Sequence, residues 1–201
     1  MSILRSSFVA ASFALSAIAA QAATAIPVAQ DGSWNALTVD ALSTSAANAL
    51  NWIDVDYSSA AGDADTLSFT FTVTDKAILR VVDLYTAGDI FNVSITSAAG
   101  TQLLNTSAVT PRDLGDAVLP FANTAAEAWG NVDFSQLQVV LGAGTYTVTG
   151  SLLQSVTDGG FALNSTAGSL SVTAVPEPTG LALVLAAAGV VGLVSRRRAR
   201  G

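Results

Sequence analysis

The most regular feature of this 201-residue sequence is an alternation of apolar and polar side chains in its middle part. Over residues 65–74 every second residue from Leu67 to Val73 is large and apolar, and Ser or Thr stands between them. A period of two residues is typical of a β-strand with one face in a core and the other in water. Because a slip of one residue would bury hydroxyls and expose apolar side chains, the pattern also predicts a well-defined register.

Three later segments repeat this alternation, and glycine-containing turns separate them from one another. Helical spacing is confined to 41–50 and 123–129, and each has room for a single helical turn. Many short strands divided by turns predict an all-β domain, and we expect an antiparallel β-sandwich of jelly-roll-like form. A parallel α/β fold is disfavoured because the sequence has no crossover helices. The three later segments are 91–96, 146–149 and 170–173.

The N-terminal end of the chain differs from this alternating part and has the form of a secretion signal. Arg5 is the only charge before an apolar run over 8–20, and small residues follow the run. This order predicts a signal peptide over residues 1–22 that is removed on export. An uncleaved membrane anchor is the alternative, but the apolar run is short for one. The predicted cleavage region consists of Ala20, Gln21, Ala22 and Ala23.

The tail at the other end, residues 175–201, has three parts. Pro176 and Pro178 favour an extended backbone around Glu177, a form that a processing enzyme can grip. The apolar segment 180–194 predicts a single transmembrane helix, although ~22 Å of helix is short for the ~30 Å core of a bilayer. A basic cluster follows and predicts that the C-terminus faces the cytoplasm. The cluster consists of Arg196, Arg197, Arg198 and Arg200.

The domain between the two ends, residues 23–174, is strongly acidic. It holds three basic and fourteen acidic residues, a net charge of −11, whereas the whole chain carries −7. Such a surface repels phosphate backbones, so we expect no nucleic-acid partner. Its length, about 150 residues, is enough for one domain with its own core.

The sequence contains neither cysteine nor histidine, which limits its chemistry. Disulfides, imidazole bases, a Ser-His-Asp triad and ordinary zinc sites are all excluded. A glycosidase needs only two facing carboxylates, but here the acids are spread along a small domain rich in Ser and Thr. We therefore expect a protein without enzymatic activity and without a cofactor.

Two groups of acids are candidates for binding or for capping turns. Asp54 and Asp56 have the spacing that places two carboxylates on one face of a strand. Oxygen clusters of this kind bind calcium, although a solvated acidic face is the simpler interpretation. Asp83 and Asp89 flank a turn sequence and form a second candidate acidic loop, and turn capping explains Asp89 equally well. The calcium candidates are Asp54, Asp56, Asp63 and Asp65.

The three tryptophans, Trp34, Trp52 and Trp129, allow two interpretations. Packing in the core or between the sheets is the simpler one, and a platform on which sugar rings stack is the alternative. Exposed tryptophans would favour sugar binding, and buried ones would favour packing. The many hydroxyls on strand faces suit hydrogen bonds to a hydrated polysaccharide.

The C-terminal tail resembles the PEP-CTERM sorting signal over residues 175–201. The resemblance rests on three elements in order: the motif Val175-Pro176-Glu177-Pro178, a short apolar span and terminal arginines. It implies that this motif is recognised by exosortase, a membrane-embedded, cysteine-dependent transpeptidase, so that the chain is a substrate. It also implies transient attachment to the inner membrane, followed by a place at the cell surface or in the extracellular matrix.

The segment Val81-Val82-Asp83-Leu84-Tyr85 resembles a group of PEP-CTERM proteins with an F-x-D-x-F motif. Val81 and Tyr85 stand where the two phenylalanines would be, so the resemblance supports only a β-sandwich shared among matrix proteins. From all these features we expect an exported, non-enzymatic protein of the surface or of the exopolysaccharide matrix of a biofilm. A carbohydrate-binding module of the cell surface is the alternative.

Overall fold

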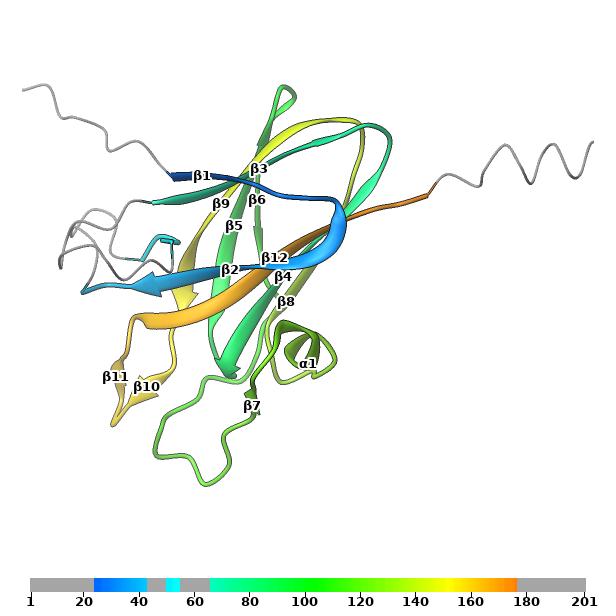
Figure 1. The fold of residues 1–201 in the computed structure, drawn as a ribbon. Helices are drawn as coiled ribbons and strands as arrows, with labels where there is room; N and C mark the ends of the chain where they lie inside the picture. The colour runs from blue at the N-terminus through cyan, green and yellow to red at the C-terminus, as the bar shows by residue number, and fades with distance from the viewer. Residues whose placement is uncertain (1–23, 43–49, 55–65, 177–201) are drawn as a thin grey trace, which may run out of the picture.

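In the part of the chain that the structure describes, the fold is a β-sandwich of two five-stranded sheets with one short helix (Figure 1). The structure, a computed structural model, describes residues 24–42, 50–54 and 66–176. The expectation of an all-β sandwich is confirmed, and the finer jelly-roll-like form stays a prediction. The predicted signal peptide and the tail from Glu177 onward lie outside the described residues. In the described part, no helix is long and apolar enough to cross a membrane.

The first sheet has the strand order β1-β3-β9-β5-β6. All its neighbours are antiparallel except β1 and β3, which pair in parallel. This pair departs from the expected antiparallel order because the chain crosses to the other sheet directly after β1, so no hairpin partner follows it (Figure 1). The strands are β1 (Thr24–Pro27), β3 (Leu67–Val73), β5 (Ile90–Ser97), β6 (Gly100–Asn105) and β9 (Gly144–Gln154).

The second sheet has the order β2-β12-β4, and two strands share the far edge of β4. The first part of β4 pairs with β8, and its last two residues pair with β7. A separate two-stranded ribbon, β10 with β11, precedes β12. The strands are β2 (Asp31–Asp40), β4 (Ala77–Thr86), β7 (Phe121–Ala122), β8 (Gln136–Leu141), β10 (Thr157–Asp158), β11 (Phe161–Ala162) and β12 (Ser165–Ala174).

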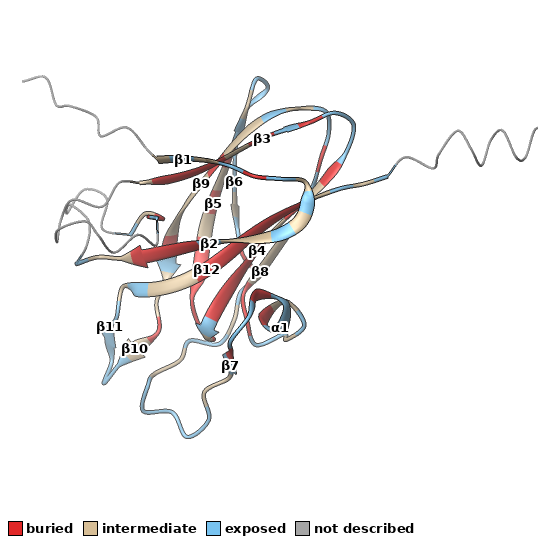
Figure 2. Ribbon diagram, in the orientation of Figure 1, coloured by how far each residue is buried: buried red, intermediate tan, exposed pale blue. Residues whose placement is uncertain are grey.

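The apolar residues of the alternating strands form the core between the sheets (Figure 2). Every apolar residue from Leu67 to Val73 is buried, so the register predicted for this strand is confirmed. Ser68, on the opposite face, is also buried, and its hydroxyl donates to the carbonyl oxygen of Thr24 at 3.3 Å. The alternation of the sequence therefore identified the face of β3 that lies in the core. The burial of Ser68 on the other face follows from the pairing of β3 with β1.

Trp52 occupies the centre of this core and is fully buried. Its ring meets Phe69 and Phe91 edge-on at centroid distances of 6.3 and 6.0 Å. Gly150 on β9 makes room for it, because a Cβ there would lie 2.3 Å from two carbons of the indole. The packing interpretation of Trp52 is confirmed, and this ring presents no face to a sugar.

A smaller cluster of buried residues covers the outer face of β4, where α1 (Ala125–Trp129) packs. Thr124 and Glu127 begin the helix with a capping box, in which each side chain accepts a hydrogen bond from the other's backbone N–H. This helix lies within 123–129, one of the two segments whose sequence has room for a helical turn. Ala125, Ala128 and Phe134 are buried against β4 at this point.

Candidate functional site

The residues of the sorting and calcium predictions fall mostly outside the described residues. Val175 and Pro176 follow β12, and the N–H of Val175 donates to the carbonyl oxygen of Lys76 at 2.9 Å. Asp54 is exposed. Within the described ranges no three acids are grouped as a metal site. The motif residues Glu177 and Pro178, the arginine cluster, the cleavage region and the remaining calcium candidates (Asp56, Asp63 and Asp65) lie outside the described residues.

Trp34 and Trp129 lie together on the outer face of the second sheet. Their ring centroids are 5.9 Å apart, and the guanidinium of Arg80 lies 5.2 Å from the centroid of the Trp129 ring. Arg80 is held there by a hydrogen bond from its Nε to the side-chain oxygen of Gln138, at 3.1 Å. Both rings are half-buried, so contacts within the chain occupy much of the surface that a sugar would need. These contacts favour the packing interpretation.

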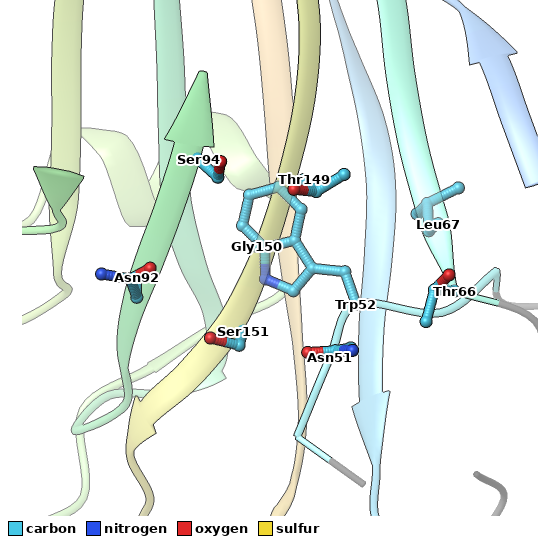
Figure 3. Close-up of a pocket in the computed structure, with 9 residues that line it drawn as sticks. All are labelled: Asn51, Trp52, Thr66, Leu67, Asn92, Ser94, Thr149, Gly150 and Ser151. Carbon is cyan, nitrogen blue, oxygen red and sulfur yellow. The ribbon is translucent and has the colours of Figure 1, made fainter. Parts of the chain in front are cut away.

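The outer face of the first sheet carries an uncharged polar cavity of about 270 Å³ (Figure 3). Asn92 and Ser94 on β5 stand opposite Ser151 and Thr149 on β9 in the strand register, and their side chains line the cavity. The amide of Asn92 donates to the side-chain oxygen of Asn105 on β6 at 2.9 Å. Hydroxyl and amide groups without formal charge suit water or a sugar and give no support to catalysis.

The turn between β4 and β5 is built on the carboxylate of Asp83. This side chain is fully buried and accepts hydrogen bonds from the N–H groups of Leu84 at 2.8 Å and of Gly88 and Asp89 at 3.3 Å each. Burial, and next the charge of Asp89, raise the pKa of Asp83 to about 9. The capping residue of this turn is therefore Asp83.

The turn-capping explanation of Asp89 is wrong, because its carboxylate accepts hydrogen bonds from outside its own turn. One of its carboxylate oxygens accepts from the N–H of Val156 at 2.8 Å and the other from the hydroxyl of Thr166 at 2.6 Å. These bonds join the turn to Val156, just before β10, and to the start of β12. Burial raises the pKa of Asp89 as well, while the hydrogen bond from Thr166 acts in the opposite direction.

The backbone of this turn is strained at Tyr85. Its φ is +66°, in the left-handed region that bulky residues seldom enter. Such a conformation costs on the order of 1–3 kcal/mol, and it persists only where the surroundings hold it. Here the three backbone bonds to Asp83 hold the loop, and Tyr85 stays 48% exposed. Its ring stacks on Phe121, which is 59% exposed, at a centroid distance of 6.0 Å.

A cavity of about 240 Å³ lies between this turn and the beginning of β12. Tyr85, Leu114 and Leu163 supply apolar side chains, and Asp89 is among the polar lining residues. Sequence inspection identified Asp83 and Asp89 but missed the cavity, because Leu114 and Leu163 are distant from the turn in the chain. The positive φ of Tyr85 has no signal in the sequence, since Gly, Asn and Asp are the residues that mark such positions.

Asp113 is a further polar centre that the sequence did not single out. It accepts hydrogen bonds from the N–H groups of Gly115 and Gly160, both at 2.9 Å, and from the hydroxyl of Thr157 at 2.7 Å. These donors, led by Gly115, lower the pKa of Asp113 to about 2. The carboxylate therefore fastens the loop before β7 to the β10–β11 ribbon beside the cavity at Tyr85.

No protein family and no curated protein matches the sequence. Among solved structures, the pre-peptidase C-terminal domain of a collagenase from Bacillus anthracis is 11% identical, with a TM-score of 0.35. It covers 76% of this chain and 96% of its own. CorA, a surface-associated copper-binding protein important for copper acquisition in Methylomicrobium album BG8, is 10% identical, with a TM-score of 0.39. It covers 77% of this chain and 99% of its own. Both the identities and the TM-scores are too low to say anything about the function of this chain.

Proposed function

We propose that this protein is an exported, non-enzymatic component of the cell surface or of the exopolysaccharide matrix. Exosortase processes it at Val175-Pro176-Glu177-Pro178 after a transient stay in the inner membrane. The observation that carries this proposal is the tail, with its proline-flanked glutamate, short apolar span and terminal arginines in order. The β-sandwich is the part that remains outside the cell.

The geometry of the sandwich supports a role in contact with hydrated material. Threonines on four neighbouring strands of the first sheet form a row across its outer face, and Thr96 and Thr101 in this row exchange a hydrogen bond at 2.9 Å. A hydrogen bond from such a hydroxyl to a sugar has a free energy similar to that of a hydrogen bond to water. A face covered with these hydroxyls therefore favours retention of the protein in a polysaccharide layer. The row consists of Thr70, Thr147, Thr96 and Thr101.

Fractionation of the producing cells tests the sorting step. We expect the full chain with both Pro176→Ala and Glu177→Ala to accumulate as uncleaved precursor in the membrane fraction, while the unchanged chain is released to the surface. A matched control is Thr179→Ala, which lies beside the motif and should be processed normally. Normal processing of the double variant would refute the proposal.

A carbohydrate-binding module is the second candidate, and the cavity beside Tyr85 favours it. This cavity combines one exposed aromatic ring, that of Tyr85, with hydroxyls, the usual mixture of a small-molecule site.

A further inference from the structure

We propose that the cavity between the β4–β5 turn and β12 binds one uncharged hexopyranose unit of a polysaccharide, with Tyr85 as the stacking platform. The inference rests on the proposed function only for the source of the ligand, an extracellular polysaccharide. The site itself is argued from the residues around the cavity.

The first argument is the aromatic surface. Tyr85 and Phe121 are two of the exposed large apolar side chains of the described part, and they stack on each other with an angle of 24° between their rings. Stacking holds each ring in place, so a ligand would lose little side-chain entropy in binding to them. The C–H groups on one face of a pyranose are complementary to the electron-rich face of such a ring.

The second argument is the strain at Tyr85. A bulky residue with φ of +66° is disfavoured on its own, and strained residues gather at ligand sites. The buried carboxyl group of Asp83 holds the strained turn with three backbone hydrogen bonds. The chain thus maintains an unfavourable conformation that places a tyrosine at the edge of a cavity, where packing of the core does not require it.

The third argument is the polar lining of the cavity. The hydroxyls of Thr38, Thr86 and Ser165 line it, and none of them has a hydrogen-bond partner among the described residues. Each hydroxyl is both a donor and an acceptor, which matches the hydroxyl groups around a sugar ring. An apolar wall beside such groups is provided by Leu114 and Leu163, which are 44% and 40% exposed.

The fourth argument is charge, and it selects an uncharged sugar over an acidic one. No basic side chain is among the described residues that line the cavity, whereas the acidic Asp89 is one of them. The domain as a whole is strongly acidic, with fourteen acidic residues against three basic ones. A uronic acid would therefore meet repulsion without a counter-charge, while a neutral hexopyranose would not.

Calorimetric titration of the full chain with hexasaccharides tests the inference. The uncharged probes are cellohexaose, maltohexaose, mannohexaose and chitohexaose (N-acetylated), and the acidic probe is hexagalacturonate. We expect at least one uncharged probe to bind and hexagalacturonate not to bind. Tyr85→Asn should weaken the binding at least about tenfold, as expected for loss of an aromatic anchor. Asparagine is the replacement of choice because it tolerates the left-handed backbone at this position.

Two further variants separate loss of the platform from loss of the fold. Leu163→Ser changes the apolar wall away from the strained turn and should also weaken binding. Phe161→Ala removes an aromatic ring that is 81% exposed and does not line the cavity, so binding should be unchanged. The inference is overturned if no uncharged probe binds, if hexagalacturonate binds as well as they do, or if a folded Tyr85→Asn variant binds normally. Because these titrations do not depend on processing of the tail, their failure is distinguishable from failure of the proposed sorting.

Discussion

Replacing Gly150 with alanine is the most direct test of how the core of this sandwich is packed. The added methyl group would lie 2.3 Å from Cε2 and Cζ2 of Trp52, whereas ordinary contacts begin at 3.4 Å. The indole would therefore have to move by about 1 Å, unless the strands separate. It has little room to move, because Trp52 is fully buried and meets Phe69 and Phe91 edge-on.

The expected cost follows from this geometry. Overpacking of a well-packed core costs about 1–3 kcal/mol, which is a large part of the stability of a typical domain, about 5–15 kcal/mol. With a urea dependence of ~2 kcal/mol/M, a loss of ~2 kcal/mol lowers the midpoint of urea unfolding by about 1 M. The backbone adds no further penalty, since Gly150 is not among the glycines with positive φ.

Urea unfolding followed by tryptophan fluorescence measures this effect. Gly142→Ala is the matched control, because a Cβ there meets nothing within 4 Å, and its midpoint should stay unchanged. Combining Gly150→Ala with Trp52→Phe should cost less than the sum of the two single changes, since the smaller ring leaves space for the methyl group. A Gly150→Ala variant as stable as the unchanged chain, or strictly additive costs, would refute the proposed contact.

Two further predictions concern a buried acid and the helix. Because the pKa of Asp83 is about 9 in the fold and 3.8 in its ordinary state, the native protein keeps a proton that the unfolded chain releases. The contribution of this bound proton to the free energy of unfolding is complete below pH 3.8 and is lost as the pH rises through about 9. The free energy of unfolding falls by up to ~1.4 kcal/mol per pH unit in this range. Urea midpoints between pH 5 and 8 should therefore fall, and less so in Asp83→Asn; equal slopes would mean that Asp83 is ionised in the fold. Thr124→Ala should destabilise the protein by about 1 kcal/mol in thermal unfolding, while Thr124→Ser retains the capping hydroxyl; equal losses would exclude the cap as the cause.

Much of the fold could be predicted from local patterns. The alternation over 67–73 identified a strand, its buried face and its register, because a side chain on a strand can point only to one of two sides. The spacing over 123–129 allowed one helical turn, which the structure has, but the capping box that begins it was missed although its two residues are only three positions apart. These features depend on neighbours in the chain, and the sequence displays neighbours directly.

The candidate site depended on contacts between distant residues. Asp83 and Asp89 were recognised as a pair, but their burial, their raised pKa values and the bond from Thr166 follow from the packing of β4 against β12. The cavity beside Tyr85 brings together five parts of the chain, from Thr38 to Ala167.

By itself, then, the sequence determined the β-class of the domain, its acidic character and the sorting prediction for its ends, since each is a property of composition or of short patterns. Only the tertiary structure decided that Trp52 belongs to the core, that Gly150 makes room for it, and that Tyr85 stands exposed at a cavity. The physical reason is that burial and desolvation are set by whichever residues the fold brings near, and no local pattern records those distances.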